Sequence, residues 1–242
     1  MNTQIHRLHY WAKTSEQPLA KGLRAARRLY QHFEIPNLPS LFNLLRTVHK
    51  LLFGTLEFIT RVFWYTPVFK SYLQNHPKRL YLFGGLPSVL GNLNIHIGDD
   101  CQVAGKITLA GRGLSTPTPS LKIGHHVVIG WQSKISVGTR VEIGNDCYIA
   151  GNCNLSGYPG HPIDPVKRAL HLPDEEHQIG DIVLGNNVWL GHSVTILPGV
   201  TVGENSVIGT GSIVTHNIPA NSLAAGIPAK VIKNIGEEGH VK

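Results

Sequence analysis

The 242-residue sequence has few cysteines, no clear membrane span and no secretion signal. Its N-terminus lacks the charged region, apolar core and small-residue cleavage site of a signal peptide, so we expect a cytoplasmic protein. The most apolar stretch, residues 51–69, has Glu57 and Arg61 near its middle, where charges are costly in hydrocarbon. These absences argue against a secreted protein and against an integral membrane protein.

Acidic residues are scarce in the N-terminal part of the chain. Residues 1–90 hold 12 Lys and Arg against three Asp and Glu, a balance of +9, whereas residues 91–242 hold 10 against 12, a balance of −2. The net charge of +7 therefore belongs to the N-terminal part. No nucleic-acid-binding motif accompanies it, so an anionic membrane is favoured over nucleic acid as its partner.

A six-residue repeat is the clearest pattern in the chain. Each repeat opens with an aliphatic residue and a glycine, and its fifth position holds a small side chain. The opening pairs are Ile97-Gly98, Ile123-Gly124, Ile129-Gly130, Ile143-Gly144, Leu184-Gly185, Leu190-Gly191, Val202-Gly203 and Ile208-Gly209. A period of six fits neither a helix nor an alternating strand and is typical of a chain coiled into a parallel β-helix.

The two kinds of repeat position predict a triangular prism. The aliphatic residue fills the interior, and the fifth residue packs near a corner where a large side chain would collide with the wall. Cys101, Cys147 and Cys153 all occupy fifth positions, so they are interpreted as core residues and not as disulfides or metal ligands. We predict a mainly β protein with a parallel β-helix over residues 84–235 and a tail over 236–242.

Residues 1–83 are predicted to form a basic, amphipathic α-helical extension. Apolar residues recur every three or four positions from Ser40 onward, and an aromatic cluster extends from Phe58 to Tyr72. Such a helix can lie in a membrane interface, so peripheral membrane contact through residues 40–80 is one hypothesis. The other is a helical cap that packs on the first coils or on a neighbouring subunit, and the two are compatible.

The repeat is interrupted between residues 156 and 181. This segment holds four prolines and three histidines before the repeat resumes at Leu184. Long loops extruded from a regular solenoid are more often functional than structural. His161, His171 and His177 are therefore candidate functional residues.

Residues 143–233 resemble the hexapeptide-repeat acyltransferases, in particular the galactoside, maltose and nodulation O-acetyltransferases. The resembling segments are SGYPGHP at 156–162, LGNNVWLG at 184–191 and AGIPAKVI at 225–232. The resemblance implies a left-handed β-helix, a homotrimer, and acetyl-CoA bound in the groove between adjacent prisms. No metal is expected.

The resemblance also implies roles for individual residues. The histidine of the Gly-His-Pro motif, His161, corresponds to the general base, and an imidazole titrating near neutrality can take a proton from a sugar hydroxyl. The residues expected to bind acetyl-CoA are Trp189, Gly191, Thr210, Gly211, Lys230 and Lys233. Tyr158, Asp164 and His171 are candidates for contact with the acceptor.

The function expected from this resemblance is acetyl transfer from acetyl-CoA to a carbohydrate hydroxyl. The basic, aromatic-rich N-terminal part favours a surface polysaccharide or lipid-linked glycan as acceptor, at the inner face of the membrane. Three alternatives stay open. They are an N-acyltransferase of nucleotide-linked amino sugars, a zinc enzyme resembling the γ-carbonic anhydrases, and a scaffold without catalysis.

Overall fold

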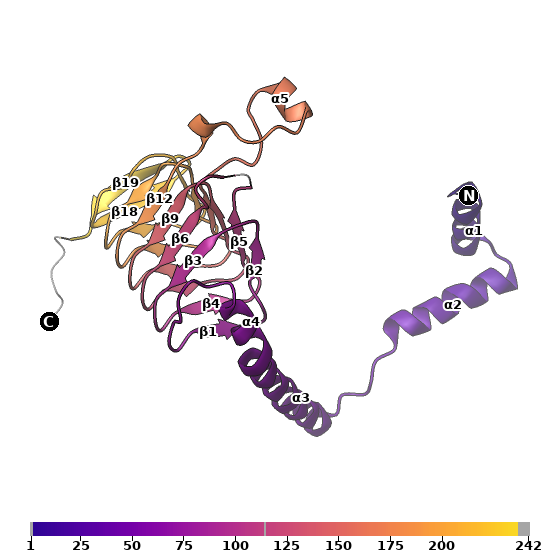
Figure 1. Ribbon diagram of the computed structural model, residues 1–242. Helices are drawn as coiled ribbons and strands as arrows, with labels where there is room; N and C mark the ends of the chain where they lie inside the picture. Colours follow the sequence, from indigo (N-terminus) through magenta and orange to yellow (C-terminus); the bar gives the residue numbers. More distant parts are fainter. Residues whose placement is uncertain (1, 114, 237–242) are drawn as a thin grey trace. The chain divides into compact units, whose positions relative to one another are not determined.

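A computed structural model describes residues 2–113 and 115–236, and the chain divides into two compact units at Gly54/Thr55 (Figure 1). The first unit is helical, as predicted. It contains α1 (Asn2–Thr14), α2 (Pro18–His32) and most of α3 (Pro39–Thr60). Proline stands at the first position of α2 and of α3, where its missing N–H costs no helical hydrogen bond.

The second unit is a three-sided parallel β-helix. Its 8-stranded sheet has the order β1 (Tyr81–Phe83), β4 (Gln102–Ala104), β7 (Val128–Ile129), β10 (Tyr148–Ile149), β13 (Trp189–Leu190), β16 (Val207–Ile208), β18 (Ser222–Gly226) and β19 (Ala229–Asn234). The 6-stranded sheet contains β2 (Ser88–Leu90), β5 (Thr108–Gly111), β8 (Lys134–Val137), β11 (Asn154–Ser156), β14 (Thr195–Ile196) and β17 (Ile213–Val214). The 5-stranded sheet contains β3 (Asn94–Ile97), β6 (Ser120–Ile123), β9 (Arg140–Ile143), β12 (Ile182–Leu184) and β15 (Thr201–Val202).

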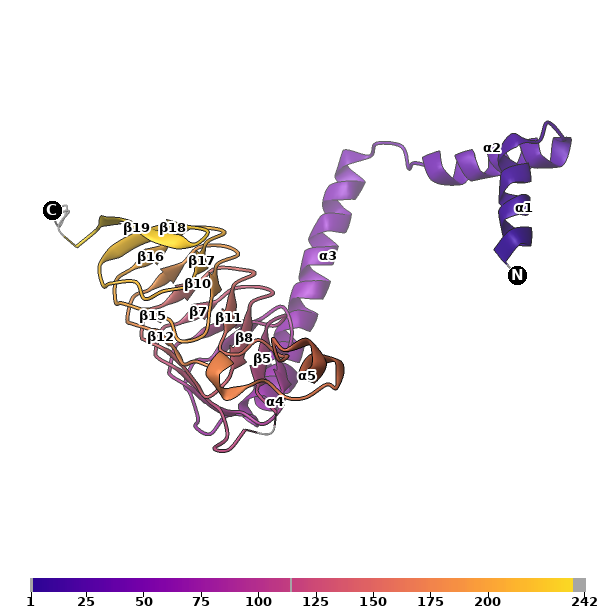
Figure 2. The ribbon, with the colours of Figure 1, turned by 90° about the horizontal axis from the view of Figure 1, so that it is seen from above.

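Successive coils stack in register, so that the same repeat position recurs directly above itself (Figure 2). The opening glycines lie at two of the three corners, and the N–H of each donates to a backbone carbonyl one coil on. Gly98 donates to Ile123, Gly124 to Ile143 and Gly144 to Leu184, each at 2.8 Å. A Cβ on any of these glycines would come within 2.5–2.6 Å of the next coil, so only glycine fits.

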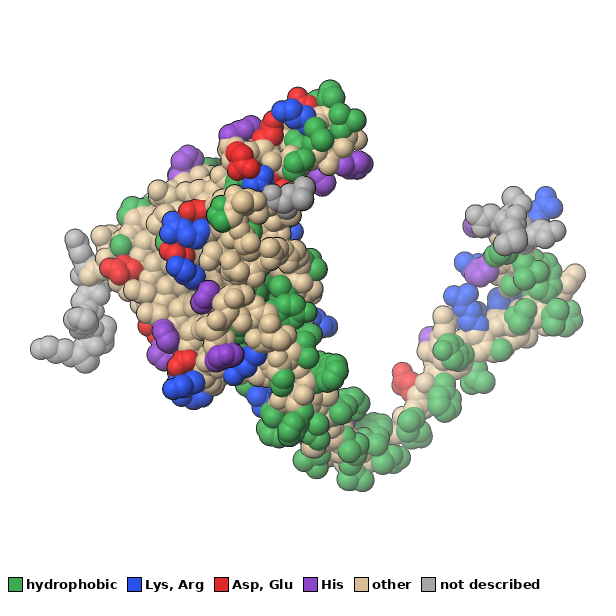
Figure 3. Space-filling view, in the orientation of Figure 1, with side chains coloured by type: hydrophobic (Ala, Val, Ile, Leu, Met, Phe, Trp, Pro, Cys, Tyr) green, Lys and Arg blue, Asp and Glu red, His purple; other side chains and the backbone are tan. Residues whose placement is uncertain are grey.

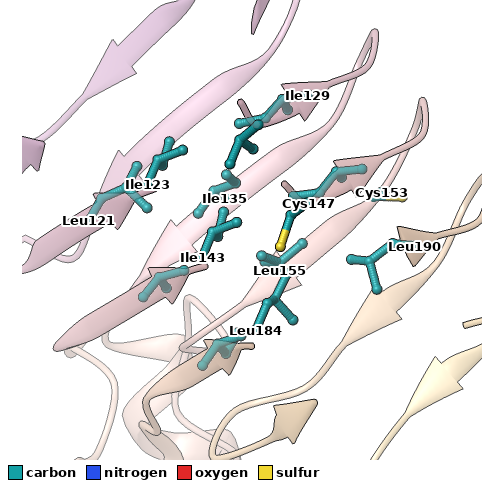
Figure 4. Close-up of a cluster of buried hydrophobic side chains, with 14 of the residues drawn as sticks. Leu121, Ile123, Ile129, Ile135, Ile143, Cys147, Cys153, Leu155, Leu184 and Leu190 are labelled. Carbon is teal, nitrogen blue, oxygen red and sulfur yellow. The ribbon is translucent and has the colours of Figure 1, made fainter. Parts of the chain in front are cut away.

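The aliphatic side chains that open the repeats fill the prism interior (Figure 4). Ile129, Leu155 and Leu190 are fully buried, and Cys147 and Cys153 belong to the same buried cluster. All three cysteines are free and buried, and burial raises the pKa of each thiol. The prediction that the cysteines are core residues is confirmed.

A short helical segment closes the N-terminal end of the prism. It comprises η1 (Arg61–Tyr65), a turn of π-helix, and α4 (Thr66–Lys70). Phe69 is fully buried in the core, and Leu73 forms an isolated bridge with Ile95. Part of the predicted aromatic cluster therefore caps the coil, whereas Phe63 and Trp64 stay exposed.

The β-helix begins slightly before the predicted residue 84. Strand β1 already pairs with β4, and Leu82 of β1 is buried in the core. The repeat did not reveal this coil because no aliphatic-glycine pair opens it. At the other end β18 and β19 form an antiparallel hairpin. The predicted tail lies outside the described residues except for Gly236.

The predicted interruption of the repeat is an extruded loop between β11 and β12. It carries α5 (Pro165–Ala169) and a 3-10 turn, η2 (Glu176–Gln178), and it stands away from the prism in Figure 1. The strands on either side of it continue the regular stacking. The loop is thus added to the coil without disturbing it.

The fifth repeat position is expected to limit side-chain size. Cys147→Ala should change the melting temperature little, whereas Cys147→Leu should lower stability by about 1–3 kcal/mol through overpacking. Thermal unfolding followed by circular dichroism of both variants tests this. Equal melting temperatures for the two variants would show that the corner is not tightly packed.

Candidate functional site

The loop places His161 on an exposed turn that is held by the side chain of Arg168. Arg168 donates from Nη1 to the carbonyl oxygens of Pro162 at 3.2 Å and Ile163 at 2.7 Å. These carbonyls directly follow His161, so the guanidinium fixes the backbone that presents the imidazole. The His161 side chain itself is exposed.

Asp164, a predicted acceptor-binding residue, is the N-cap of α5. Its Oδ1 accepts hydrogen bonds from the N–H groups of Val166 at 2.8 Å and Lys167 at 2.9 Å. The bond from Lys167 N–H is the main reason that the pKa of Asp164 lies below its usual value. The residue therefore has a structural task, and its contact with the acceptor stays a prediction.

A cavity of ≈320 Å³ opens beside His161. Its lining consists of Gly113, Tyr158, Gly160, His161, His171, Leu172, Pro173 and Asp174. The fold thus brings together three of the predicted site residues, Tyr158, His161 and His171. Burial raises the pKa of the Tyr158 phenol, Asp174 adds to that rise, and Arg112 opposes it.

Arg112 connects the prism to the part of the loop that leads back to β12. Its Nη2 donates to the backbone oxygen of Asp174 at 3.1 Å and to Oε1 of Glu176 at 2.8 Å. Arg112 is 9% exposed, so this ion pair is partly shielded from water on the arginine side. No repeat points to Arg112 in the sequence, because it stands in the irregular stretch between the repeats that open at Ile97 and Ile123.

The residues predicted to bind the acetyl donor lie elsewhere on the prism. Trp189 is half-exposed on the outer face of the 8-stranded sheet, in register with Tyr148 of β10. Gly191, Thr210 and Gly211 stack at the corner that follows this sheet, where Gly211 N–H donates to the His192 carbonyl at 2.8 Å. Lys230 and Lys233 lie on β19, at the C-terminal end of the same sheet.

These two groups of predicted residues do not meet within one chain. The loop with His161 leaves between the 6-stranded and 5-stranded sheets, whereas Trp189 belongs to the 8-stranded sheet. The lining of the cavity beside His161 includes none of the residues predicted to bind acetyl-CoA.

A groove of ≈730 Å³ lies along a different corner from His161. It follows the stacked glycines Gly98, Gly124, Gly144 and Gly185, which carry no side chain to fill the corner. The groove is thus a consequence of coil stacking and is less convincing as an active site than the smaller cavity.

The parts of the chain that the structure describes contain no group of three His, Cys, Asp or Glu residues arranged to hold a metal ion. The same parts contain no helix that is both long and apolar enough to cross a membrane.

The fold and the repeat define a class of protein. Residues 181–216 match the family described as "Bacterial transferase hexapeptide (six repeats)". Residues 181–216 of the second unit are thus similar to this transferase family, and the unit has the left-handed parallel β-helix that the resemblance implies.

Individual relatives are similar over parts of their length. Galactoside O-acetyltransferase of Escherichia coli K12 is 61% identical over 56 residues, 23% of this chain and 28% of that protein. A Saccharomyces cerevisiae protein with a provisional acetyltransferase name is 48% identical over 79 residues, 33% of this chain and 38% of that protein. The matching part thus spans 28–38% of the length of these two relatives.

A solved structure supports the fold. A mutant of AntD, an N-acyltransferase from Bacillus cereus in complex with dTDP and coenzyme A, superposes with a TM-score of 0.55 and 17% identity. The match covers 70% of this chain and 87% of that one. At this identity it establishes the architecture alone.

Proposed function

We propose that the protein is an O-acetyltransferase that moves an acetyl group from acetyl-CoA to a hydroxyl of a carbohydrate. The observation that carries the proposal is a histidine in the lining of a cavity, in a unit whose residues 181–216 match a transferase hexapeptide family. His161 occupies the Gly-His-Pro motif, and Arg168 fixes the backbone that follows it. The 61% identity over 56 residues to a galactoside O-acetyltransferase supports this substrate class over an amine acceptor.

The proposed chemistry needs one proton carrier and no acyl-enzyme. The His161 imidazole takes the proton of the acceptor hydroxyl while its oxygen attacks the thioester carbonyl. The tetrahedral intermediate places a negative charge on the former carbonyl oxygen, which a backbone N–H of the adjoining coil would stabilise. Its collapse breaks the carbon–sulfur bond, and the thiolate of coenzyme A takes the proton from the imidazolium.

A homotrimer is the proposed working form. His161 and the predicted donor-binding residues lie on different edges of one prism, so a neighbouring prism would have to complete the site. Half-exposed Trp189 and Tyr148, side by side on a flat outer face, supply apolar area for such an interface.

Peripheral attachment to the cytoplasmic face of a membrane is the proposed role of the first unit. Leu44, Leu51 and Phe53 of α3 are exposed, and Figure 3 shows hydrophobic side chains gathered along this helix. The preceding helix α2 carries Lys21, Arg24, Arg27 and Arg28. An apolar helix next to a basic one suits an anionic lipid surface.

Replacement of the proposed base should remove activity. His161→Ala is expected to lower kcat by roughly 100- to 10,000-fold, because a general base contributes about that much. Coenzyme A release from acetyl-CoA with a panel of saccharides measures it, and His177→Ala is the matched control from the same loop. Full activity in His161→Ala would show that another group accepts the proton.

The oligomeric state can be measured directly. Light scattering of the purified chain should give three times the 26.5 kDa chain mass. A mass of one chain at assay concentration would contradict the trimer.

Membrane attachment should depend on the basic helix. The full chain is expected to float with phosphatidylserine-containing vesicles and not with pure phosphatidylcholine, and Arg24→Glu with Arg27→Glu should reduce flotation severalfold. Lys106→Glu, a charge reversal in the second unit, is the control. Equal flotation of all variants would contradict the proposal.

A further inference from the structure

We propose that Asp174 is the acceptor-binding carboxylate of this site, and that it selects a neutral, hydroxyl-rich acceptor over an acidic one. The inference rests on the proposed function and names the substrate class of the same cavity. It starts from a buried carboxylate with one oxygen that has no hydrogen-bond partner.

Asp174 is a buried acid with one unpartnered oxygen. It is 9% exposed, and its Oδ1 has no hydrogen-bond partner among the described residues. Oδ1 is fully buried, while the side chain contributes to the lining of the cavity beside His161. Buried polar groups are nearly always hydrogen-bonded in native proteins, and a missing hydrogen bond at such a group lowers stability. A carboxylate with spare acceptor capacity in the lining of a cavity points to a ligand that carries hydrogen-bond donors.

The neighbouring charged groups form ion pairs with one another, and the Nε of Arg112 is, like Oδ1 of Asp174, buried without a partner. Arg112 donates from Nη2 to Glu176 and to the backbone oxygen of Asp174. This contact positions Asp174 without occupying its carboxylate. Glu175 forms an ion pair with Lys167. Asp174 is therefore the carboxylate left for a ligand in this part of the loop.

The charge of the lining decides which ligand fits. Of the eight lining residues, Asp174 alone is an Asp, Glu, Lys or Arg. A carboxylate accepts strong hydrogen bonds from hydroxyl groups and repels a second carboxylate. The ≈320 Å³ cavity lies at the small end of the range for small-molecule sites, ~300–1,000 Å³. A saccharide unit with free hydroxyls would place one on Asp174 while another faces His161.

Enzyme kinetics with two matched acceptors test the inference. The probes are the methyl glycosides of a neutral hexose and of the corresponding hexuronic acid, with coenzyme A release as readout. The wild-type chain should use the neutral glycoside with the higher kcat/KM. Asp174→Ala should raise the KM for the neutral glycoside roughly 10- to 100-fold, the equivalent of a lost charge-assisted hydrogen bond. The KM for acetyl-CoA should stay unchanged.

The controls separate this role from misfolding. Asp174→Asn keeps the side-chain shape and one oxygen acceptor, so its acceptor KM should fall between those of wild type and Asp174→Ala. Asp181→Ala is the matched control, because Asp181 lies in the same segment but binds Thr139 and Arg140 outside the cavity. Melting temperatures confirm that each variant is folded.

Three results would overturn the inference. They are a wild-type preference for the hexuronic acid glycoside, an unchanged acceptor KM in Asp174→Ala, and a shift in the pH profile of kcat without a change in acceptor KM. The last would mean that Asp174 orients the imidazole. Calorimetric binding of the neutral glycoside, present in wild type and lost in Asp174→Ala, tests the subsite without turnover. If wild type released no coenzyme A yet showed this binding difference, the proposed function would fail while the subsite stood.

Discussion

The close stacking of one coil on the next is the constraint on which the rest of the structure depends. Each opening glycine donates to a carbonyl one coil on, and its position leaves no room for a Cβ. The same spacing keeps the fifth position small and drives the aliphatic side chains inward. Because the strands are only two to six residues long, no sheet could persist alone, and stability arises between coils.

This regularity explains where the sequence was informative. Eight aliphatic-glycine pairs and a set of small fifth residues predict the parallel β-helix, the buried cysteines and the site of the extruded loop. The sequence did not predict the first coil, because β1 carries no such pair. The cap formed by α4 was one of two hypotheses that the sequence left open. Phe69 is aromatic in either case, and only its burial against the core distinguishes a cap from a membrane contact.

The candidate site was less predictable because its contacts cross from one element to another. Motif similarity led to His161, and the fold places Tyr158 and His171 around the same cavity. Arg112 lies 62 residues before Asp174, and no periodicity connects them. For Asp164 the sequence predicted a contact with the acceptor, because a carboxylate in a functional loop can bind one. In the structure this carboxylate caps α5. Residue type therefore indicates candidates, and hydrogen-bond partners decide which remain available to a ligand.

The central claim is that the active site is shared between subunits, with His161 from one prism and the donor-binding face from another. Mixed oligomers test it most directly. His161→Ala and Trp189→Ala chains, each of low activity alone, should regain a measurable fraction of wild-type coenzyme A release when they are unfolded, mixed and refolded together. This follows because some interfaces then combine two intact halves. If the mixed oligomers form and stay as inactive as either variant alone, the two residues do not act across an interface, and the account is contradicted.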